Sequence, residues 1–353
     1  MLPIFFSIVI PAGLVKPAAI LTVLLVMLAR SLTWRRRSRR AGHPVSLATA
    51  LGDDWVVSAI LVAGLGLLWW SGLLDGPARL PLHSSGLLIA TGFILGIWLA
   101  QREGKRRGQD PERIADLTFW ILLAGVVGSR LYYILVNWHD YFEATTFLTN
   151  TPLGRIPRLL VIWEGGLVFY GGFIGAVVVA WLYMRRHGMD FLAHADTLIP
   201  SVALGHFFGR LGCFGAGCCW GDVAGSHLPW AVHFPPESLA YQTFASRATP
   251  GAFLAADRSA TLPLHPTQLY ESFGELGLFL LLVLLVRPRK RFHGQVLATW
   301  LMAYALLRTL VESFRGDVER GVVLGLGVGI WTSLLIFAAG AAIFATAGRR
   351  ARV

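Results

Sequence analysis

The sequence predicts an all-α integral membrane protein, a polytopic bundle of about nine transmembrane helices. Of the 353 residues, 55% are hydrophobic and only 14% are charged, and the mean hydropathy is +0.60. Soluble domains carry roughly 25% charged residues, so this composition excludes a disordered chain and a soluble enzyme. The apolar stretches run without interruption, whereas a membrane barrel needs short alternating strands.

Nine apolar segments account for the bundle. They are residues 4–29, 55–74, 85–100, 115–136, 166–184, 195–212, 268–286, 295–312 and 322–346. We expect the first two to form an additional N-terminal hairpin within residues 1–80, and the other seven to form the core, residues 81–348. The first segment lacks a basic leader and a small-residue cleavage site, so we expect a retained helix rather than a signal peptide.

The basic residues predict the orientation of the bundle. Most of the 31 Lys and Arg residues lie in alternate connections, within residues 30–40, 102–113, 185–186 and 287–291 and in the tail 349–353. The positive-inside rule makes these parts cytoplasmic. The N-terminus and the long 213–264 connection are then outside and the C-terminus is inside. The net charge of +11 reflects this topology and needs no nucleic-acid partner.

Several ionisable residues fall inside predicted helices, where a charge is costly unless it serves a ligand or a pathway, and four of them stand out. Arg130, Arg210 and Arg308 lie near the outer ends of three helices, and Glu312 follows Arg308 by about one turn. Because guanidinium groups fork onto phosphate oxygens, we expect them to bind a phospholipid headgroup in the outer leaflet. The alternatives are that each Arg snorkels to the interface, or that Arg308 and Glu312 form a packing ion pair.

The eighth segment carries a polar stripe. Tyr304, Arg308, Glu312 and Arg315 recur at spacings of 4, 4 and 3 residues, which places them on one helix face. A polar stripe on an apolar helix should face a cavity rather than lipid.

Two segments, residues 163–175 and 205–221, are rich in glycine. Glycine permits close packing of helices, and it also lets the backbone turn toward a ligand. Glycine content alone leaves both interpretations open.

All three cysteines, Cys213, Cys218 and Cys219, lie within seven residues on the predicted outer side. Disulfides persist there, so Cys213 could pair with Cys218 or Cys219. A thiol near Arg210 could instead be a nucleophile, because a cation lowers the thiol pKa. The spacing matches no standard zinc pattern, so we expect no metal and no other cofactor.

A third motif, residues 265–271 with the sequence HPTQLYE, precedes the seventh segment. Pro266 suits a helix start, and Gln268 and Glu271 offer hydrogen bonding or acid–base capacity. The alternative is an ordinary helix N-terminus in which Glu271 complements the helix dipole.

Together these segments resemble the prolipoprotein diacylglyceryl transferase family of bacterial membrane enzymes. Residues 163–175 are similar to the glycine-rich core helix of the family, and residues 265–271 match its His-Pro-[Ser/Thr]-Gln-Leu-Tyr-Glu motif. Residues 209–221 are similar to its Gly-Arg-x-Gly-Asn-Phe-x-x-x-Glu-x-x-Gly signature. Residues 304–315 match its Tyr-x-x-x-Arg followed by Val-Glu-x-Phe-Arg. The likeness covers about residues 83–346.

The resemblance implies a reaction in which a diacylglyceryl group moves from phosphatidylglycerol to the lipobox cysteine of a preprolipoprotein signal peptide, releasing glycerol phosphate. It implies a multi-pass protein of the bacterial inner membrane whose active site faces the periplasm. The implied catalytic residues are Arg210, Arg308, Tyr304 and Tyr170, the last at a position where many members carry a histidine. The implied substrate-binding residues are Arg210, Arg308, Arg130, His83, Gly171, Gly172, His265, Gln268, Glu271, Glu312, Cys213 and Cys218.

The sequence departs from the family pattern at two signature positions. Cys213 stands in place of the signature Asn, and Cys218 stands in place of the signature Glu. We expect transferase activity because Arg210 and Arg308 are both present. The alternatives are a paralogue that binds or transports a phospholipid or another anion, and a thiol-handling membrane protein that uses the three cysteines.

Overall fold

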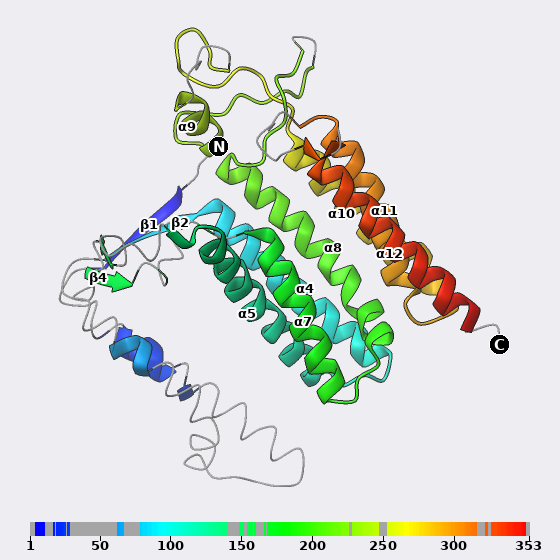
Figure 1. Ribbon diagram of the computed structural model, residues 1–353. Coiled ribbons are helices and arrows are strands. Elements are labelled where there is room, and N and C mark those ends of the chain that lie inside the picture. Colours follow the sequence, from blue (N-terminus) through cyan, green and yellow to red (C-terminus); the bar gives the residue numbers. More distant parts are fainter. Residues whose placement is uncertain are drawn as a thin grey trace. The chain divides into compact units, whose positions relative to one another are not determined.

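The computed structural model shows a mainly helical protein (Figure 1). It describes residues 4–10, 17, 19–25, 27–28, 62–66, 78–139, 148–151, 154–157, 159, 166, 168–225, 228–246, 253–315, 322–323 and 326–350. Parts of the predicted segment 4–29 and most of segment 55–74 lie outside these residues, so the N-terminal hairpin stays a prediction. The chain divides into two units. The first comprises residues 1–6, 82–125 and 174–353, and the second comprises residues 7–81 and 126–173.

Long helices form where segments three to nine predict them. They are α4 (Ser84–Arg106), α5 (Pro111–Val136), α7 (Phe169–Arg186), α8 (Phe191–Ala216), α10 (Thr267–Leu281), α11 (Gln295–Glu312) and α12 (Val328–Arg350). A π-helical turn, η4 (Leu282–Val286), and a 3-10 turn, η5 (Arg287–Arg289), continue α10. Within the described ranges, four helices are long and apolar enough to cross a membrane: α4, α5, α12 and α10 with its continuation. The helical membrane class is therefore confirmed.

The structure differs from the prediction at the beginning of the first segment. Ile4–Ile10 forms strand β1, which pairs with β2 (Ala78–His83). The prediction of a helix from residue 4 is wrong there. β-branched and aromatic residues dominate this stretch and favour a strand, and Pro11 disfavours helical backbone in the residue before it.

The ninth segment also begins differently. A helix was expected from residue 322, but Val322–Val323 (β5) and Leu326–Gly327 (β6) pair as an antiparallel hairpin, and α12 starts only at Val328. Four glycines between residues 321 and 329 explain the delay, because glycine is a poor helix former and a good turn former.

Helix α8 is the centre of the first unit, where it packs against α4 and α10, and α11 packs against α12 (Figure 1). The side chain of Asp190 caps its N-terminus by accepting a hydrogen bond from the backbone N–H of Ala193 at 2.6 Å. Gly217 ends it in the left-handed conformation, with φ of 67°. The close packing on α4 needs small residues, since a side chain at Gly212 would meet the backbone of Ser85.

The connection between α8 and α10 folds into a small cap with a core of its own. Its buried side chains surround the short helix α9 (Leu239–Ala245) and are Phe234, Ala240, Phe244, Leu254 and Leu264. Helix α8 runs on to Ala216, so the connection predicted to begin at residue 213 starts later, and Cys213 lies in the last turn of α8.

In the second unit, the last turns of α5 pack against the start of α7. The backbone N–H of Val168 donates to the carbonyl of Ser129 at 3.3 Å. A side chain at Gly171 would collide with the carbonyl of Gly128, so this close approach requires glycine. Strands β3 (Leu148–Thr151) and β4 (Gly154–Pro157) form an antiparallel hairpin in the same unit.

Candidate functional site

An ionic cluster joins α8 to α10 in the first unit. Arg210 on α8 donates from Nη2 to Oε1 of Glu271 on α10 at 2.8 Å, and from Nε to Nε2 of His206 at 3.2 Å. Glu271 is fully buried. It lies past the first turn of α10, which holds no acidic residue, so the alternative role in complementing the helix dipole is wrong. Its partner is a cation on another helix.

A second carboxylate extends this cluster. The Glu275 side chain, also fully buried, pairs through Oε1 with Nδ1 of His206 at 2.8 Å and accepts a hydrogen bond from Nε1 of Trp300 at 3.3 Å. Sequence reasoning did not assign His206, Glu275 or Trp300 to the site. A signal was present, because each lies four residues from a predicted site residue on the same helix.

Tyr304 on α11 lies at the centre of the charged groups. Its ring stacks on Trp300, with centroids 5.3 Å apart and an interplanar angle of 11°, and it contacts the ring of His206 at 5.5 Å. Its hydroxyl lies within electrostatic range of the carboxylates of Glu271 and Glu275 as well as of Arg210 and Arg308. The two cations therefore act on the same phenol from different helices.

Arg308 and Glu312 form the predicted ion pair, with Nη2 and Oε2 2.6 Å apart. Gly329 of α12 lies against this pair, since a side chain there would overlap the Glu312 carboxylate. Helix α11 ends at Glu312, so Arg315 lies beyond it. The prediction that Arg315 continues the polar stripe along the helix is wrong, because the helix stops three residues earlier.

Three buried polar atoms of this region have neither a hydrogen bond nor an ion pair within the described residues. They are Oε1 of Gln268, Oε2 of Glu271 and Nη1 of Arg308. Buried polar atoms are nearly always satisfied in folded proteins, and leaving one unpaired costs about 1–3 kcal/mol. The cluster thus retains one donor and two acceptors for a bound molecule.

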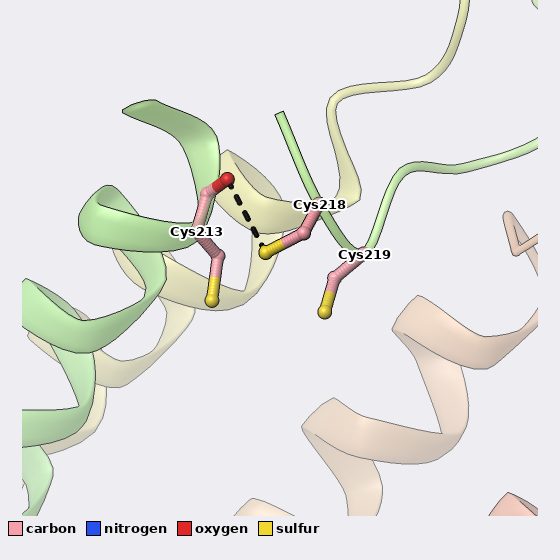
Figure 2. A group of neighbouring side chains, drawn as sticks. All are labelled: Cys213, Cys218 and Cys219. Carbon is pink, nitrogen blue, oxygen red and sulfur yellow. Dashed lines mark hydrogen bonds between the residues drawn. The ribbon is translucent and has the colours of Figure 1, made fainter. Parts of the chain in front are cut away.

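The three cysteines gather where α8 ends (Figure 2). All are free thiols, and their sulfur atoms lie within 4.8 Å of one another. Cys218 Sγ donates to the backbone carbonyl of Cys213 at 3.6 Å. The amide of Gln268 donates to the carbonyl of Cys218 at 2.6 Å, so the predicted site residue Gln268 holds the cysteine loop against α10.

His265 lies beside the cap. Its Nδ1 is 3.2 Å from the hydroxyl of Tyr270, which also accepts a hydrogen bond from Nε1 of Trp230 at 2.8 Å, and its ring contacts Phe314. This aromatic cluster attaches the cap to the start of α10. His83 is exposed and occupies the N-cap position of α4. Its side chain makes no capping hydrogen bond there.

The remaining predicted residues belong to the second unit. Arg130 donates to the carbonyls of Leu159 at 3.1 Å and Gly166 at 3.3 Å. Tyr170 is exposed, and Gly171 and Gly172 are buried in the first turn of α7. The structure brings together Arg210, Arg308, Tyr304, Gln268, Glu271 and Glu312, with Cys213 and Cys218 beside them. The meeting of Arg130 and Tyr170 with this group stays a prediction.

Fold and site define a helical membrane protein with a buried ionic site built from three helices. The sequence model of the prolipoprotein diacylglyceryl transferase family matches residues 74–346, and the chain belongs to this family of transferases. Relatives named phosphatidylglycerol–prolipoprotein diacylglyceryl transferase include a Thermosynechococcus vestitus protein, 34% identical over 233 residues (66% of this chain, 76% of the relative). A Sodalis glossinidius protein is 35% identical over 283 residues (78% of this chain, 91% of the relative). The predicted resemblance is confirmed.

Proposed function

We propose that the protein transfers the diacylglyceryl group of phosphatidylglycerol to the lipobox cysteine thiol of a preprolipoprotein and releases glycerol phosphate. The observation that carries this proposal is the buried ionic cluster of α8, α10 and α11, in which ion pairs hold Arg210 and Arg308 and one Arg308 nitrogen has no partner within the described residues. The names of the relatives supply the reaction, and the site supplies the charges that the reaction needs.

The chemistry fits the distribution of charge. The acceptor sulfur attacks the glyceryl carbon next to the phosphate as the carbon–oxygen bond breaks, and the departing phosphate takes the electron pair and, in the net reaction, the proton that the thiol gives up. Arg210 and Arg308 stabilise this charge in a site shielded from water, where fixed cations act most strongly. Glu271 and Glu312 hold the two guanidinium groups in place through ion pairs of 2.8 and 2.6 Å. Tyr304 orients the phosphate between them.

The placement of the protein is part of the proposal. We infer about nine spans with an outside N-terminus and a cytoplasmic C-terminus, and a cap in the periplasm. The site then opens to the outer leaflet of the bacterial inner membrane, where both phosphatidylglycerol and an exported signal peptide are available. From their positions in the family motifs, we also propose a catalytic role for Tyr170 and substrate-binding roles for a further set of residues: Arg130, Gly171, Gly172, His83 and His265.

The test is transfer of labelled diacylglyceryl from phosphatidylglycerol to a lipobox peptide by membranes that contain the full chain. We expect labelled peptide with the wild type and with the control Arg185→Ala, which removes an exposed cation at the C-terminal end of α7. Arg308→Ala should lose the product. Absence of transfer by wild-type membranes, beside an active family enzyme, would refute the proposal.

The two cysteines at signature positions favour one alternative, a paralogue that binds or transports an anionic lipid without transferring it. Lipid binding measured separately from turnover separates the two functions. A transferase with Arg308→Ala should lose both, whereas a pure binding protein has no turnover to lose.

A further inference from the structure

The cysteine cluster is built by unusual backbone rather than by regular structure. Gly217 turns the chain back with φ of 67°, and Cys219 also adopts a left-handed conformation, with φ of 59°. A positive φ at a residue other than glycine is uncommon and persists where the surroundings impose it. This geometry returns Cys218 and Cys219 to the last turn of α8, beside Cys213.

Two buried side chains of α10 hold this loop. Gln268 donates to the carbonyl of Cys218 at 2.6 Å, and the hydroxyl of Thr267 donates to the carbonyl of Cys219 at 2.9 Å. The three thiols are thus arranged before any ligand arrives, on a loop supported from outside the cluster. Such support is what orients ligands at metal sites.

We propose that Cys213, Cys218 and Cys219 bind one zinc ion through their three sulfur atoms, with a fourth coordination position left open. A bound zinc ion holds thiolate sulfurs at about 2.3 Å, and in a tetrahedral site such sulfurs lie roughly 4 Å apart, close to the grouping seen here. The sequence spacing did not predict this site, because two of the ligands are adjacent in the chain and only the left-handed turn brings them to the third.

The charges around the cluster favour the loaded state. Binding releases the three thiol protons, and three thiolates with one divalent zinc carry a net charge of −1. Arg210 and Arg315 both act electrostatically on Cys219, and Arg210 also acts on Cys213. A negative centre therefore forms beside two cations.

The open position has a specific use that rests on the proposed function. A thiol that coordinates zinc loses its proton, so the acceptor cysteine would bind there as a thiolate and release its proton to water. Its sulfur then attacks the glyceryl carbon, forming the S–C bond as the C–O bond breaks, and the glycerol phosphate leaves with the electron pair toward Arg210 and Arg308. The product thioether is a weaker ligand and dissociates.

The first test measures metal binding without turnover. The full-length chain, free of a histidine tag, is purified in detergent, reduced, stripped of metal and titrated with cobalt(II), then with zinc. We expect one cobalt per chain, a sulfur-to-cobalt charge-transfer band, and its loss when zinc is added. Changing all three cysteines to Ser should abolish the band, whereas the control His187→Ala, at an exposed histidine, should keep it.

A second measurement does not depend on variants that fail to fold. Zinc should protect all three thiols of the wild type from alkylation, read by mass spectrometry of the intact chain. The proposal is overturned if the thiols react equally fast with and without zinc. It is also overturned if the cobalt band is absent, if the band survives the triple substitution, or if the protein isolated without reductant contains a disulfide.

The third test addresses the open position. Adding a lipobox peptide to the cobalt-loaded protein should shift the charge-transfer band, and the peptide with Ser in place of Cys should not. If the metal binds but the band does not move and transfer continues in the triple Ser variant, the acceptor role is wrong and the proposed function stands. If the peptide shifts the band but the zinc-loaded wild type transfers nothing, the proposed function fails and the metal site stands.

Discussion

The first unit holds buried charges at both ends of its helices, and the two groups differ in how completely their polar atoms are paired. At the end that carries the basic connections, Asp196 accepts hydrogen bonds from the backbone N–H groups of Gly294 and Leu297 at 2.8 and 2.9 Å and pairs with Lys290 at 2.8 Å. Near it, Glu103 uses one oxygen for Arg107 and the other for Arg287. Both carboxylates are fully paired within the protein.

At the other end, the cluster of Arg210, Glu271, Gln268 and Arg308 leaves three buried atoms unpaired within the described residues. The same kinds of residue are therefore present at both ends, but among the described residues the second end is the one with capacity left for a ligand. We therefore expect a buried charge in this protein to be structural where its partners saturate it, and functional where they do not.

The largest expected effect is on the free energy of unfolding, at the end where the buried carboxylates are fully paired. Asp196→Ala removes the partner of two backbone donors and of Lys290, and we expect it to lower the free energy of unfolding by about 3–5 kcal/mol. Thermal unfolding in detergent measures this. The control Asp190→Ala removes an exposed N-cap of the same helix and should cost only about 1 kcal/mol. Equal losses in the two variants would contradict the structural role of Asp196.

The next effect is on turnover, at the end where three buried atoms are unpaired within the described residues. Arg308→Ala should reduce lipid transfer by about 100- to 1,000-fold, because a fixed cation facing the leaving phosphate is lost. Arg308→Lys keeps the positive charge but cannot donate two parallel hydrogen bonds to a phosphate. Its transfer rate should therefore lie between those of the wild type and Arg308→Ala. The rate of peptide labelling per folded molecule is the measurement. An Arg308→Ala protein with the wild-type rate would remove this arginine from the site.

A smaller effect is expected from Gly329→Ala. The added methyl group would meet the Glu312 carboxylate, and overpacking of this kind costs about 1–3 kcal/mol. Because Glu312 holds Arg308, we expect transfer to fall about tenfold. The control Gly277→Ala places its methyl group in open space on α10 and should leave the rate unchanged. A full rate in Gly329→Ala would show that the position of Glu312 does not matter.

The smallest effect is expected from Glu103→Gln. Its partners Arg107 and Arg287 are each partly exposed and can be hydrated when the pair breaks. We expect a loss of about 1 kcal/mol in unfolding free energy and an unchanged transfer rate. A loss of turnover in this variant, measured in the same labelling assay, would contradict a purely structural role for the fully paired charges.

The helices of the first unit could be predicted from the sequence because lipid leaves the backbone few options over an apolar run. The predicted segment 295–312 coincides with α11. The prediction failed where glycine or β-branched residues favour other backbone, at β1 and at the hairpin before α12. Periodicity alone does not detect such local preferences in an apolar run.

The site could be predicted in part. Charges inside apolar segments identified Arg210 and Arg308, since only function or pairing explains them. Their partners on other helices, Glu275 and Trp300 among them, depend on helix rotation, which the sequence does not state. The cysteine cluster depends on the positive φ of Cys219, for which the sequence shows no signal.

The π-helical turn η4 lies between the two halves of the long helix that begins at α10. Each residue of an α-helix advances the side-chain direction by about 100°, so an irregular turn sets the phase of the later half independently of the earlier half. Glu271 and Glu275 can then point at α8 while Arg287 points at Glu103. Deleting one residue within Leu282–Val286 would turn Arg287 away from Glu103. The side chains of Glu271 and Glu275 would keep their direction toward α8.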